Sequence, residues 1–374
     1  MQQQSKPDSI FASPADLAAC RATLRNGSRS FYAASYLLPH QVCDAAVALY
    51  AFCRVADDAV DLSDRRTEAL AELRDRLDRI YAGNPLPLPA DRAFAAVVCC
   101  YAIPRAVPDA LLEGFEWDAE GRRYEDLSGV YAYSARVAGT VGVMMTLLMG
   151  ERDPQVIARA CDLGVAMQLT NIARDVGEDA RAGRVYLPLS WLREAGVEPE
   201  VWLREPSFNA GVGATVERLL RDADRLYERA GVGIARLPRS CRAGIHAARF
   251  LYAEIGREVE RQGMDSVSSR AVVPFSRKTS LLSRILVATA VPERVKEEIP
   301  PLAETRFLVE AVEAAQEPAR LPGSLFRPSQ RKLDEQVAWV LDLFQRLEER
   351  DRERLARMHS TDVMEHTARA AQRR

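Results

Sequence analysis

Apolar residues recur at intervals of three and four along most of the chain, which is the spacing of one face of an α-helix. The clearest example is the charged segment 67–81, in which Leu70, Leu73, Leu77 and Ile80 form one apolar stripe. The further helices that this spacing predicts cover residues 14–27, 28–38, 45–60, 90–101, 108–120, 127–149, 154–179, 217–237 and 239–262. No segment alternates apolar and polar residues with the period of two that a strand requires. We therefore predict an all-α fold.

The distribution of composition along the chain predicts one domain with a further segment on either side. Residues 1–14 are polar and lack the apolar core of a signal peptide. Residues 15–300 contain nothing that resembles a linker, so we predict that they form a single helical domain. Residues 301–374 are predicted to be a C-terminal extension. Within it, segment 317–328 is rich in proline and glycine, segment 333–374 begins as an amphipathic helix, and the final dozen or so residues are expected to be disordered.

The net charge, the cysteines and the hydropathy exclude several classes of protein. The 374 residues carry a formal net charge of −2 and no basic stripe, so no nucleic-acid partner is expected. The seven cysteines form no Cys-x-x-Cys pair, and we predict reduced thiols in a cytoplasmic protein rather than a zinc site. The longest apolar run, 137–149, is too short to span a bilayer. The basic amphipathic stretch 270–289 fits either a solvated helix face or a face that touches a membrane.

Polar residues lie along one face of the helix predicted over residues 154–179. Gln168, Asn171, Asp175 and Asp179 follow one another at steps of three, four and four, so their side chains stack over successive turns. The residues between them are largely apolar, which predicts that this stripe faces a pocket. Two carboxylates on adjacent turns of such a face repel each other, and we expect a positive charge between them.

A second acidic pair lies in the helix predicted over residues 45–60. Asp57 and Asp61 are four residues apart, and Arg54 lies one turn earlier. Acidic residues inside an otherwise apolar helix are costly unless they are paired or bound to metal. An isolated pair of this kind is usually a solvated face, but two such pairs, each beside an arginine, favour a shared site. Carboxylate oxygens suit Mg²⁺, which commonly also binds water and substrate phosphate, so we infer that the two faces bind a diphosphate through magnesium. Asp58 is the carboxylate least expected to bind metal.

Three segments, in the same order as in a known family, carry a resemblance that covers residues 18 to about 278. The first combines residues 28–31 with the acidic motif at 57–61. The second is Tyr-Ser-Ala-Arg-Val-Ala-Gly-Thr-Val-Gly at residues 133–142, and the third is the block 163–188. Together they resemble the squalene/phytoene synthase family of head-to-head prenyl-diphosphate condensing enzymes. The resemblance implies an isoprenoid-synthase helical fold with a central active-site cavity. It also implies that two geranylgeranyl diphosphates condense through prephytoene diphosphate to phytoene, with release of diphosphate.

The resemblance also implies roles for individual polar residues. The side chains expected to hold magnesium, with manganese as the alternative ion, are Asp57, Asp61, Asn171, Asp175 and Asp179. The side chains expected to bind the substrate through its diphosphate groups, or to lie beside them, are Ser28, Ser30, Arg54, Gln168, Asn171, Arg174 and Arg270. The bound metal would offset the charge that develops on the departing diphosphate.

Four aromatic residues are candidates for the apolar part of the site. Tyr133 is expected to bring its hydroxyl near the reacting carbons and to act with the four aspartates in catalysis. Phe31 and Tyr252 are expected to border the same cavity, and Tyr186 follows a Gly-Arg pair on a loop that we expect to close over the site. Aromatic faces stabilise carbocations, and an apolar cavity excludes water. The alternative for each tyrosine is an amphipathic residue between packed helices.

Other reactions remain open at this point. Small residues at positions 34, 35 and 47 favour a twenty-carbon substrate, and the alternative is squalene- or dehydrosqualene-type condensation of two farnesyl diphosphates. Chain-elongating prenyltransferases repeat their aspartate-rich motif, whereas the second motif here is Asp175-x-x-x-Asp179, and the metal-binding triad of terpene cyclases is absent. An inactive helical assembly factor of the same fold would be expected to have lost the aspartates.

The cofactor and partner expectations follow from the same resemblance. No NADPH is expected, because phytoene formation needs no reduction. The expected substrate is geranylgeranyl diphosphate, and the product would be handed to a phytoene desaturase. We expect a cytoplasmic protein that touches the inner face of the cell membrane transiently.

Overall fold

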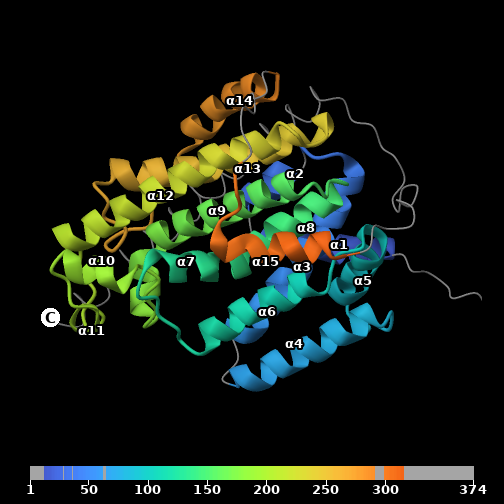
Figure 1. The fold of residues 1–374 in the computed structure, drawn as a ribbon, viewed down its shortest axis with the longest axis horizontal. Helices are drawn as coiled ribbons and strands as arrows, with labels where there is room; N and C mark the ends of the chain where they lie inside the picture. Colours follow the sequence, from blue (N-terminus) through green and yellow to red (C-terminus); the bar gives the residue numbers. More distant parts are fainter. Residues whose placement is uncertain (1–11, 28, 36, 62–64, 291–298, 316–374) are drawn as a thin grey trace, which may run out of the picture.

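The computed structural model describes residues 12–27, 29–35, 37–61, 65–290 and 299–315, and in these residues it contains helices and loops but no strand. The longest helix, α9 (Pro154–Arg181), runs through the middle of the bundle (Figure 1). Helix α12 (Ala210–Ile234) packs most extensively against it, and α13 (Arg239–Arg261) lies beside both. The predicted all-α fold is confirmed.

The N-terminal half supplies one wall of the bundle. Its helices are α1 (Pro14–Gly27), α2 (Arg29–Ser35), α3 (His40–Asp61), α4 (Arg66–Tyr81), α5 (Pro89–Tyr101) and α6 (Ala106–Ala119). They share a core in which Phe52 of α3 stacks on Phe94 of α5, with ring centroids 4.2 Å apart. The apolar stripe predicted for α4 is buried at all four positions.

The C-terminal half contains short elements that the apolar spacing did not predict. Its remaining elements are α7 (Leu127–Ser134), the π-helical turn η1 (Ala135–Gly139), α8 (Thr140–Leu148), α10 (Leu189–Glu194), α11 (Pro199–Trp202), α14 (Phe275–Ala290), the 3₁₀ turn η2 (Ala303–Thr305) and α15 (Arg306–Glu313). The helix predicted over residues 127–149 is therefore interrupted by a π-turn, a feature that often marks functional sites. Helices α10, α11 and α15 are too short to show a clear period.

Capping residues fix where the two central helices begin. The side chain of Asp153 accepts hydrogen bonds from the backbone N–H groups of Gln155 and Val156 at 2.9 and 3.2 Å, and α9 starts at the next residue. Asn209 caps α12 in the same way by accepting from the N–H of Val212 at 3.0 Å. The predicted start of α12 at residue 217 was wrong because this cap precedes a first turn that contains two glycines.

Two glycines let neighbouring helices approach α9 at backbone distance. A Cβ atom on Gly142 of α8 would lie 2.4 Å from the carbonyl oxygen of Ala160, and one on Gly164 of α9 would lie 2.4 Å from that of Ala138. Any larger residue would force these helices apart. The wall formed by η1, α8 and α9 is therefore held together by main-chain contacts.

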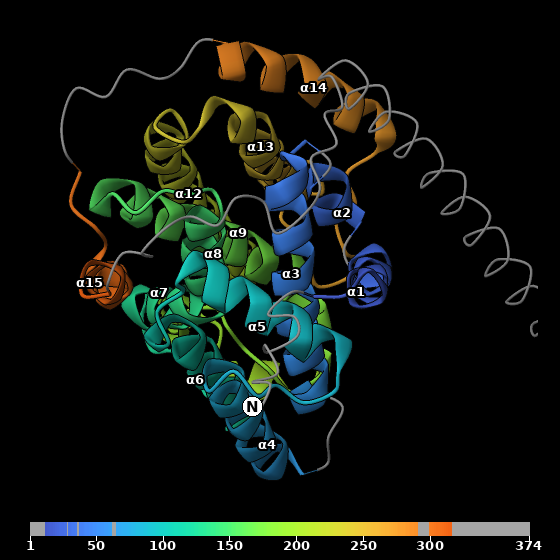
Figure 2. The ribbon, with the colours of Figure 1, turned by 90° about the vertical axis from the view of Figure 1, so that its right-hand side faces the viewer.

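The segment after residue 298 packs on the domain. Leu308, Val309 and Val312 of α15 are buried in the same core as α3 and α5, and Ser128 Oγ lies 2.5 Å from Glu304 Oε1. Figure 2 shows α15 beside α7, on the side of the molecule opposite α1. The linker predicted at 317–328, the helix beginning at 333 and the polar residues 1–11 lie outside the described residues. Among the helices that are described, none has the length and hydropathy to cross a membrane.

Candidate active site

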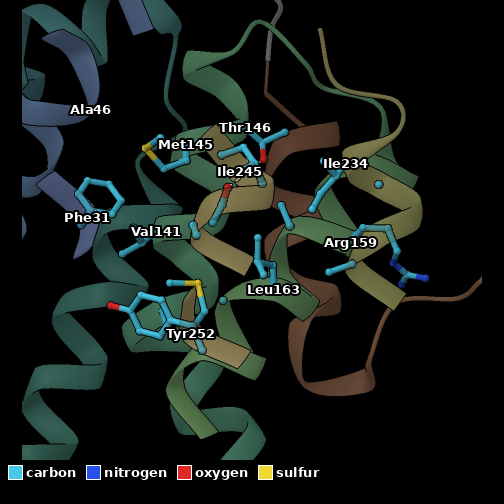
Figure 3. A pocket seen from close by; sticks show the side chains of 18 of the residues that line it. Phe31, Ala46, Val141, Met145, Thr146, Arg159, Leu163, Ile234, Ile245 and Tyr252 are labelled. Atoms are coloured by element: carbon cyan, nitrogen blue, oxygen red, sulfur yellow. Dashed lines mark hydrogen bonds between the residues drawn. The ribbon is translucent and has the colours of Figure 1, made fainter. Parts of the chain in front are cut away.

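A cavity of about 290 Å³ runs along α9 between α3, α8, α12 and α13. Its lining is mostly apolar, and Figure 3 shows Phe31 of α2 on one side and Ile234 of α12 on the other. The side chains that α9 contributes follow one helical stripe from Val156 to Asn171. The cavity can therefore take a long apolar chain that lies parallel to α9.

The predicted polar stripe of α9 continues this cavity wall. Gln168 and Asn171 line the cavity, and Asn171 Nδ2 donates to Gln168 Oε1 at 3.4 Å. Asp175 and Asp179 lie one and two turns further along the same helix, beyond the apolar section. The arrangement places an apolar tunnel and an acidic region end to end on one helix.

Two arginines surround Asp175. Arg174 Nε and Arg270 Nε each lie 2.7 Å from Asp175 Oδ1, and their Nη2 atoms lie 2.5 and 3.3 Å from Oδ2. Burial alone would raise the pKa of Asp175, but the hydrogen bonds and charges of the two arginines outweigh it and hold the pKa below its ordinary value. The positive charge expected between the acidic side chains is thus supplied in part by the chain itself.

Asp179 is in the opposite electrostatic situation. Burial, together with the charges of Asp175 and Asp118, raises the pKa of Asp179 to about 7, against the smaller opposing effect of Arg184. Glu178 adds a smaller effect of the same sign, so four carboxylates contribute to the electrostatics at this end of α9. Such a region favours a further cation.

Asp57 of α3 lies four residues after Cys53, which lines the same cavity. Arg54 Nη1 lies 3.4 Å from Asp57 Oδ2, while Arg54 Nη2 lies 2.5 Å from Asp58 Oδ1, so the closer partner of this arginine is Asp58. Burial raises the pKa of the Cys53 thiol, which lines the cavity, to about 12, and the charge of Asp57 adds to this effect.

Two tyrosines connect the acidic faces of α3 and α9. Both Tyr50 and Tyr252 line the cavity. Burial raises the pKa of Tyr50 to about 12, with further contributions from Tyr252 and Asp57 and an opposing one from Arg54. Burial also raises the pKa of Tyr252, with an opposing effect from Arg174 and an added one from Asp175. The electrostatic effects of the two faces therefore overlap at this mouth of the cavity.

The oxygen donors of α3 and α9 are of the type that binds a hard divalent cation. Asp57, Asp175, Asp179 and Asn171 offer carboxylate and amide oxygens, the ligand type that magnesium prefers. Among the residues whose placement is described, no three Asp, Glu, His or Cys side chains form a ready-made metal cage. The side chain of Asp61 lies outside that set. The residues present suit an ion whose shell is completed by water and phosphate.

Tyr133 lies away from the cavity lining and contacts an unexpected carboxylate. Its hydroxyl donates to Asp118 Oδ2 at 2.8 Å, and the Tyr186 hydroxyl donates to Asp118 Oδ1 at 2.7 Å. The two rings stack with centroids 5.1 Å apart. Tyr186 is buried and lies with Asp179 and Arg184 beside a small second pocket. Asp118 joins both tyrosines to the acidic end of α9, and no sequence motif singled it out.

The remaining predicted positions divide into two groups. Phe31 lines the cavity and stacks on Tyr50 with ring centroids 5.6 Å apart. Ser28 and the side chains of Ser30 and Asp61 lie outside the described part of the chain. The small residues that were taken to leave room for a longer substrate, Ala34, Ser35 and Val47, are buried between helices and do not line the cavity. That argument for substrate length is therefore not supported.

Comparison with known families defines the class of this site. The family model for squalene/phytoene synthase matches residues 24–278, which is more than half of the chain. The chain belongs to the squalene/phytoene synthase family. The matched region contains every predicted site residue, from Ser28 to Arg270.

Individual relatives narrow the comparison. The chain is 53% identical over 315 residues to phytoene synthase from Cereibacter sphaeroides, covering 80% of this chain and 89% of the relative. It is 52% identical over 304 residues to phytoene synthase from Rhodobacter capsulatus, covering 79% and 90%. Among solved structures, a ligand complex of a dehydrosqualene synthase superposes with a TM-score of 0.67 at 33% identity, covering 73% of this chain and 96% of that one.

Proposed function

We propose that this chain is a prenyltransferase that joins two geranylgeranyl diphosphates head to head. The first step gives prephytoene diphosphate and the second gives phytoene, and each step releases one diphosphate ion and one proton. The observation that carries this proposal is the identity of more than half of the aligned residues to relatives named phytoene synthase. The long apolar cavity that leads to an acidic and basic mouth supports it physically.

The residues at the mouth have the chemistry that this reaction needs. Arg174 and Arg270 can bind diphosphate oxygens as well as the carboxylate of Asp175, because a guanidinium is a fork of hydrogen-bond donors. Magnesium, when bound by the nearby carboxylates, would offset the negative charge of the departing diphosphate. Tyr50 and Tyr252 line the cavity, and aromatic rings at such positions can stabilise a carbocation.

The apolar lining protects the reactive intermediate. A carbocation formed in this cavity meets side chains such as Val141, Met145 and Leu163 rather than bulk water. Because the neutral hydrocarbon product also prefers such a lining, its release is favoured toward another apolar environment. The proposal therefore includes handover to a desaturase that acts on phytoene.

Product analysis tests the reaction. The purified chain is incubated with labelled geranylgeranyl or farnesyl diphosphate, with and without magnesium and with and without NADPH, and the products are identified by mass. We expect a forty-carbon hydrocarbon from geranylgeranyl diphosphate that requires the metal and is unaffected by NADPH. A thirty-carbon product from farnesyl diphosphate, with geranylgeranyl diphosphate ignored, would contradict the proposal.

Helix α14 supports transient contact with an anionic membrane face. It carries Arg277 and Arg284 beside Leu286 and Val287, whose exposed fractions are 47% and 64%. Basic and exposed apolar residues together favour the interface of an anionic bilayer. Flotation with anionic vesicles should recover more protein than flotation with neutral vesicles, and Val287→Glu should reduce the recovery. Equal recovery from both vesicle types would remove this part of the proposal.

A further inference from the structure

Arg159 of α9 lines the part of the cavity remote from the acidic mouth, with Val156 one turn further along the same helix. Arg159 lines the cavity, yet only 3% of the residue is exposed. It lies twelve residues before Asn171, which at 1.5 Å per residue corresponds to roughly 18 Å along the helix axis. Figure 3 shows Arg159 on the side of the cavity opposite Phe31, with its guanidinium turned outward. The methylene part of the side chain therefore forms the wall.

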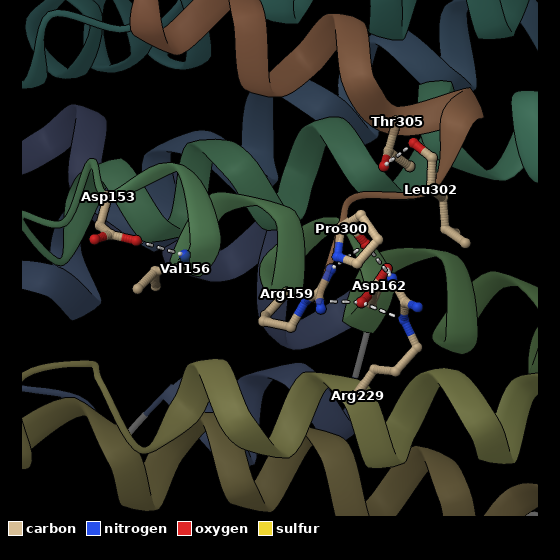
Figure 4. Close-up of polar contacts among 8 residues, drawn as sticks. All are labelled: Asp153, Val156, Arg159, Asp162, Arg229, Pro300, Leu302 and Thr305. Atoms are coloured by element: carbon tan, nitrogen blue, oxygen red, sulfur yellow. Dashed lines mark hydrogen bonds and ion pairs between the residues drawn. The ribbon is translucent and has the colours of Figure 1, made fainter. Parts of the chain in front are cut away.

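The guanidinium of Arg159 is held by a buried cluster of charges (Figure 4). Its Nε lies 2.9 Å from Oδ2 of Asp162, which is completely buried, and Arg229 Nε donates to the same oxygen at 2.9 Å. The Nη2 atoms of Arg159 and Arg229 donate to the carbonyl oxygen of Pro300 at 3.1 and 2.8 Å. The ion pair with Asp162 and the hydrogen bond to Pro300 orient Arg159, although its Nε and Nη1 atoms are buried without a hydrogen-bond partner.

Helix α12 is shaped to receive this side chain. A Cβ atom on Gly233 would lie 2.3 Å from Cβ of Arg159, so a residue larger than glycine would displace the arginine. The next residue, Ile234, also lines the cavity and is buried. Arg159 and Ile234 line this part of the cavity from two helices, and Val156 and Leu237 line it further on.

We infer that Arg159 sets the longest prenyl chain that the cavity accepts. Asp162, Arg229 and the carbonyl of Pro300 act as positioning groups, because they hold the arginine without lining the route of the substrate. Pro300 lies beyond residues 24–278, so a segment outside the family match contributes to substrate selection. This inference rests on the proposed function and assigns a residue to its choice of substrate length.

Shortening either side chain at this end should make room for a longer tail. Arg159→Ala removes the methylenes that form the wall, and Ile234→Ala removes three carbons without disturbing the charge cluster. A difference of a few methylene groups in an apolar pocket changes specificity about tenfold or more. We therefore expect each variant to raise the use of a twenty-five-carbon diphosphate relative to a twenty-carbon one by about tenfold.

The test is a competition between labelled twenty-carbon and twenty-five-carbon diphosphates in equal amounts. The ratio of their consumption is measured for the wild type, Arg159→Ala, Ile234→Ala and the control Leu226→Ala. Leu226 is on the same helix and as buried as Ile234, but it does not line the cavity. The control should keep the wild-type ratio, which separates opening of the cavity from a general loosening of α12.

Each outcome decides the inference. A rise of about tenfold in both cavity variants, without a rise in the control, supports it. If Arg159→Ala does not fold, Ile234→Ala decides alone. Cavity variants within twofold of the wild type, or a control that shifts as much as they do, overturn it. If the wild type consumes only fifteen-carbon diphosphate, the proposed function fails. The inference is then supported if the variants accept a tail one isoprene unit longer than the wild type does, and overturned if they do not.

Discussion

Replacing Asp118 with asparagine tests the connection between the two stacked tyrosines and the acidic end of α9. Each carboxylate oxygen of Asp118 accepts a hydrogen bond from one tyrosine, at 2.8 Å from Tyr133 and 2.7 Å from Tyr186. Asp118→Asn exchanges one carboxylate oxygen for an NH₂ group, so the volume at the end of α6 is preserved. The substitution leaves one carbonyl oxygen as an acceptor and turns the amide NH₂ group toward the other hydroxyl.

The size of the effect follows from these two contacts. A hydrogen bond to a charged group contributes about 1.5–3 kcal/mol to stability, and one between neutral groups about 0.5–1.5 kcal/mol. One charged contact becomes neutral and the other loses its acceptor, which together predict a loss of about 3 kcal/mol. Removal of the Asp118 charge also relieves Asp179, whose pKa it raises, and this offsets part of the loss. The expected net loss in the free energy of unfolding is therefore about 1–3 kcal/mol.

Urea unfolding of Asp118→Asn, Tyr186→Phe and the double variant measures this quantity. Because the hydroxyl of Tyr186 and the carboxylate of Asp118 are direct partners, the double variant should lose less than the sum of the single losses, by about 0.5–2 kcal/mol. The dependence on urea concentration should stay at the wild-type value, since unfolding exposes the same surface in each variant. A loss below about 0.5 kcal/mol in Asp118→Asn, or strict additivity in the cycle, would refute the reasoning.

Two further predictions concern the mouth of the cavity and the packing of α13. Asp175→Asn should reduce turnover by on the order of a hundredfold while the circular dichroism spectrum is unchanged. The control Glu178→Gln, on the same helix, should retain activity. Equal losses of activity in both variants would contradict a special role for Asp175. Burial and the charges of Arg249 and Arg242 lower the pKa of His246 to about 4, so as the pH falls below the unfolded pKa of about 6.5 only the unfolded chain gains this proton and stability declines. The free energy of unfolding should fall by about 2 kcal/mol between pH 7.5 and 5 because of His246. This fall should be absent in His246→Phe, and an identical pH dependence in that variant would contradict the assignment to His246.

The fold was predictable because its long helices carry their own signal. The apolar stripe of α4 and the polar stripe of α9 are local patterns, so both could be read before any packing was known. Asp118 and Arg159 carry no such signal. The partners of Asp118 lie 15 and 68 residues away, and Asp162, which faces Arg159, also binds Arg229 from 67 residues away. Such roles arise only when distant segments are brought together.

The substrate-length argument failed for a related physical reason. Small residues at positions 34, 35 and 47 indicate how closely helices can pack, but they do not indicate which side of a helix faces a cavity. In the structure these residues are buried against neighbouring helices, while Phe31 of the same segment faces the cavity. A helical period identifies the buried face of a helix. It does not distinguish side chains buried against protein from side chains that face an apolar ligand, because both give the same period.

The main-chain contacts of Gly142 and Gly164 constrain the width of the cavity more strongly than its length. The two dimensions should therefore change at different rates in evolution. The width is set where carbonyl oxygens of one helix contact the α-carbons of another. A wider or narrower cavity would therefore require whole helices to shift. The length ends at individual side chains, which single codon changes can trim or extend. Proteins that evolve from this one should therefore differ readily in the length of the hydrocarbon that they accept. They should keep a cavity width suited to an unbranched or methyl-branched chain.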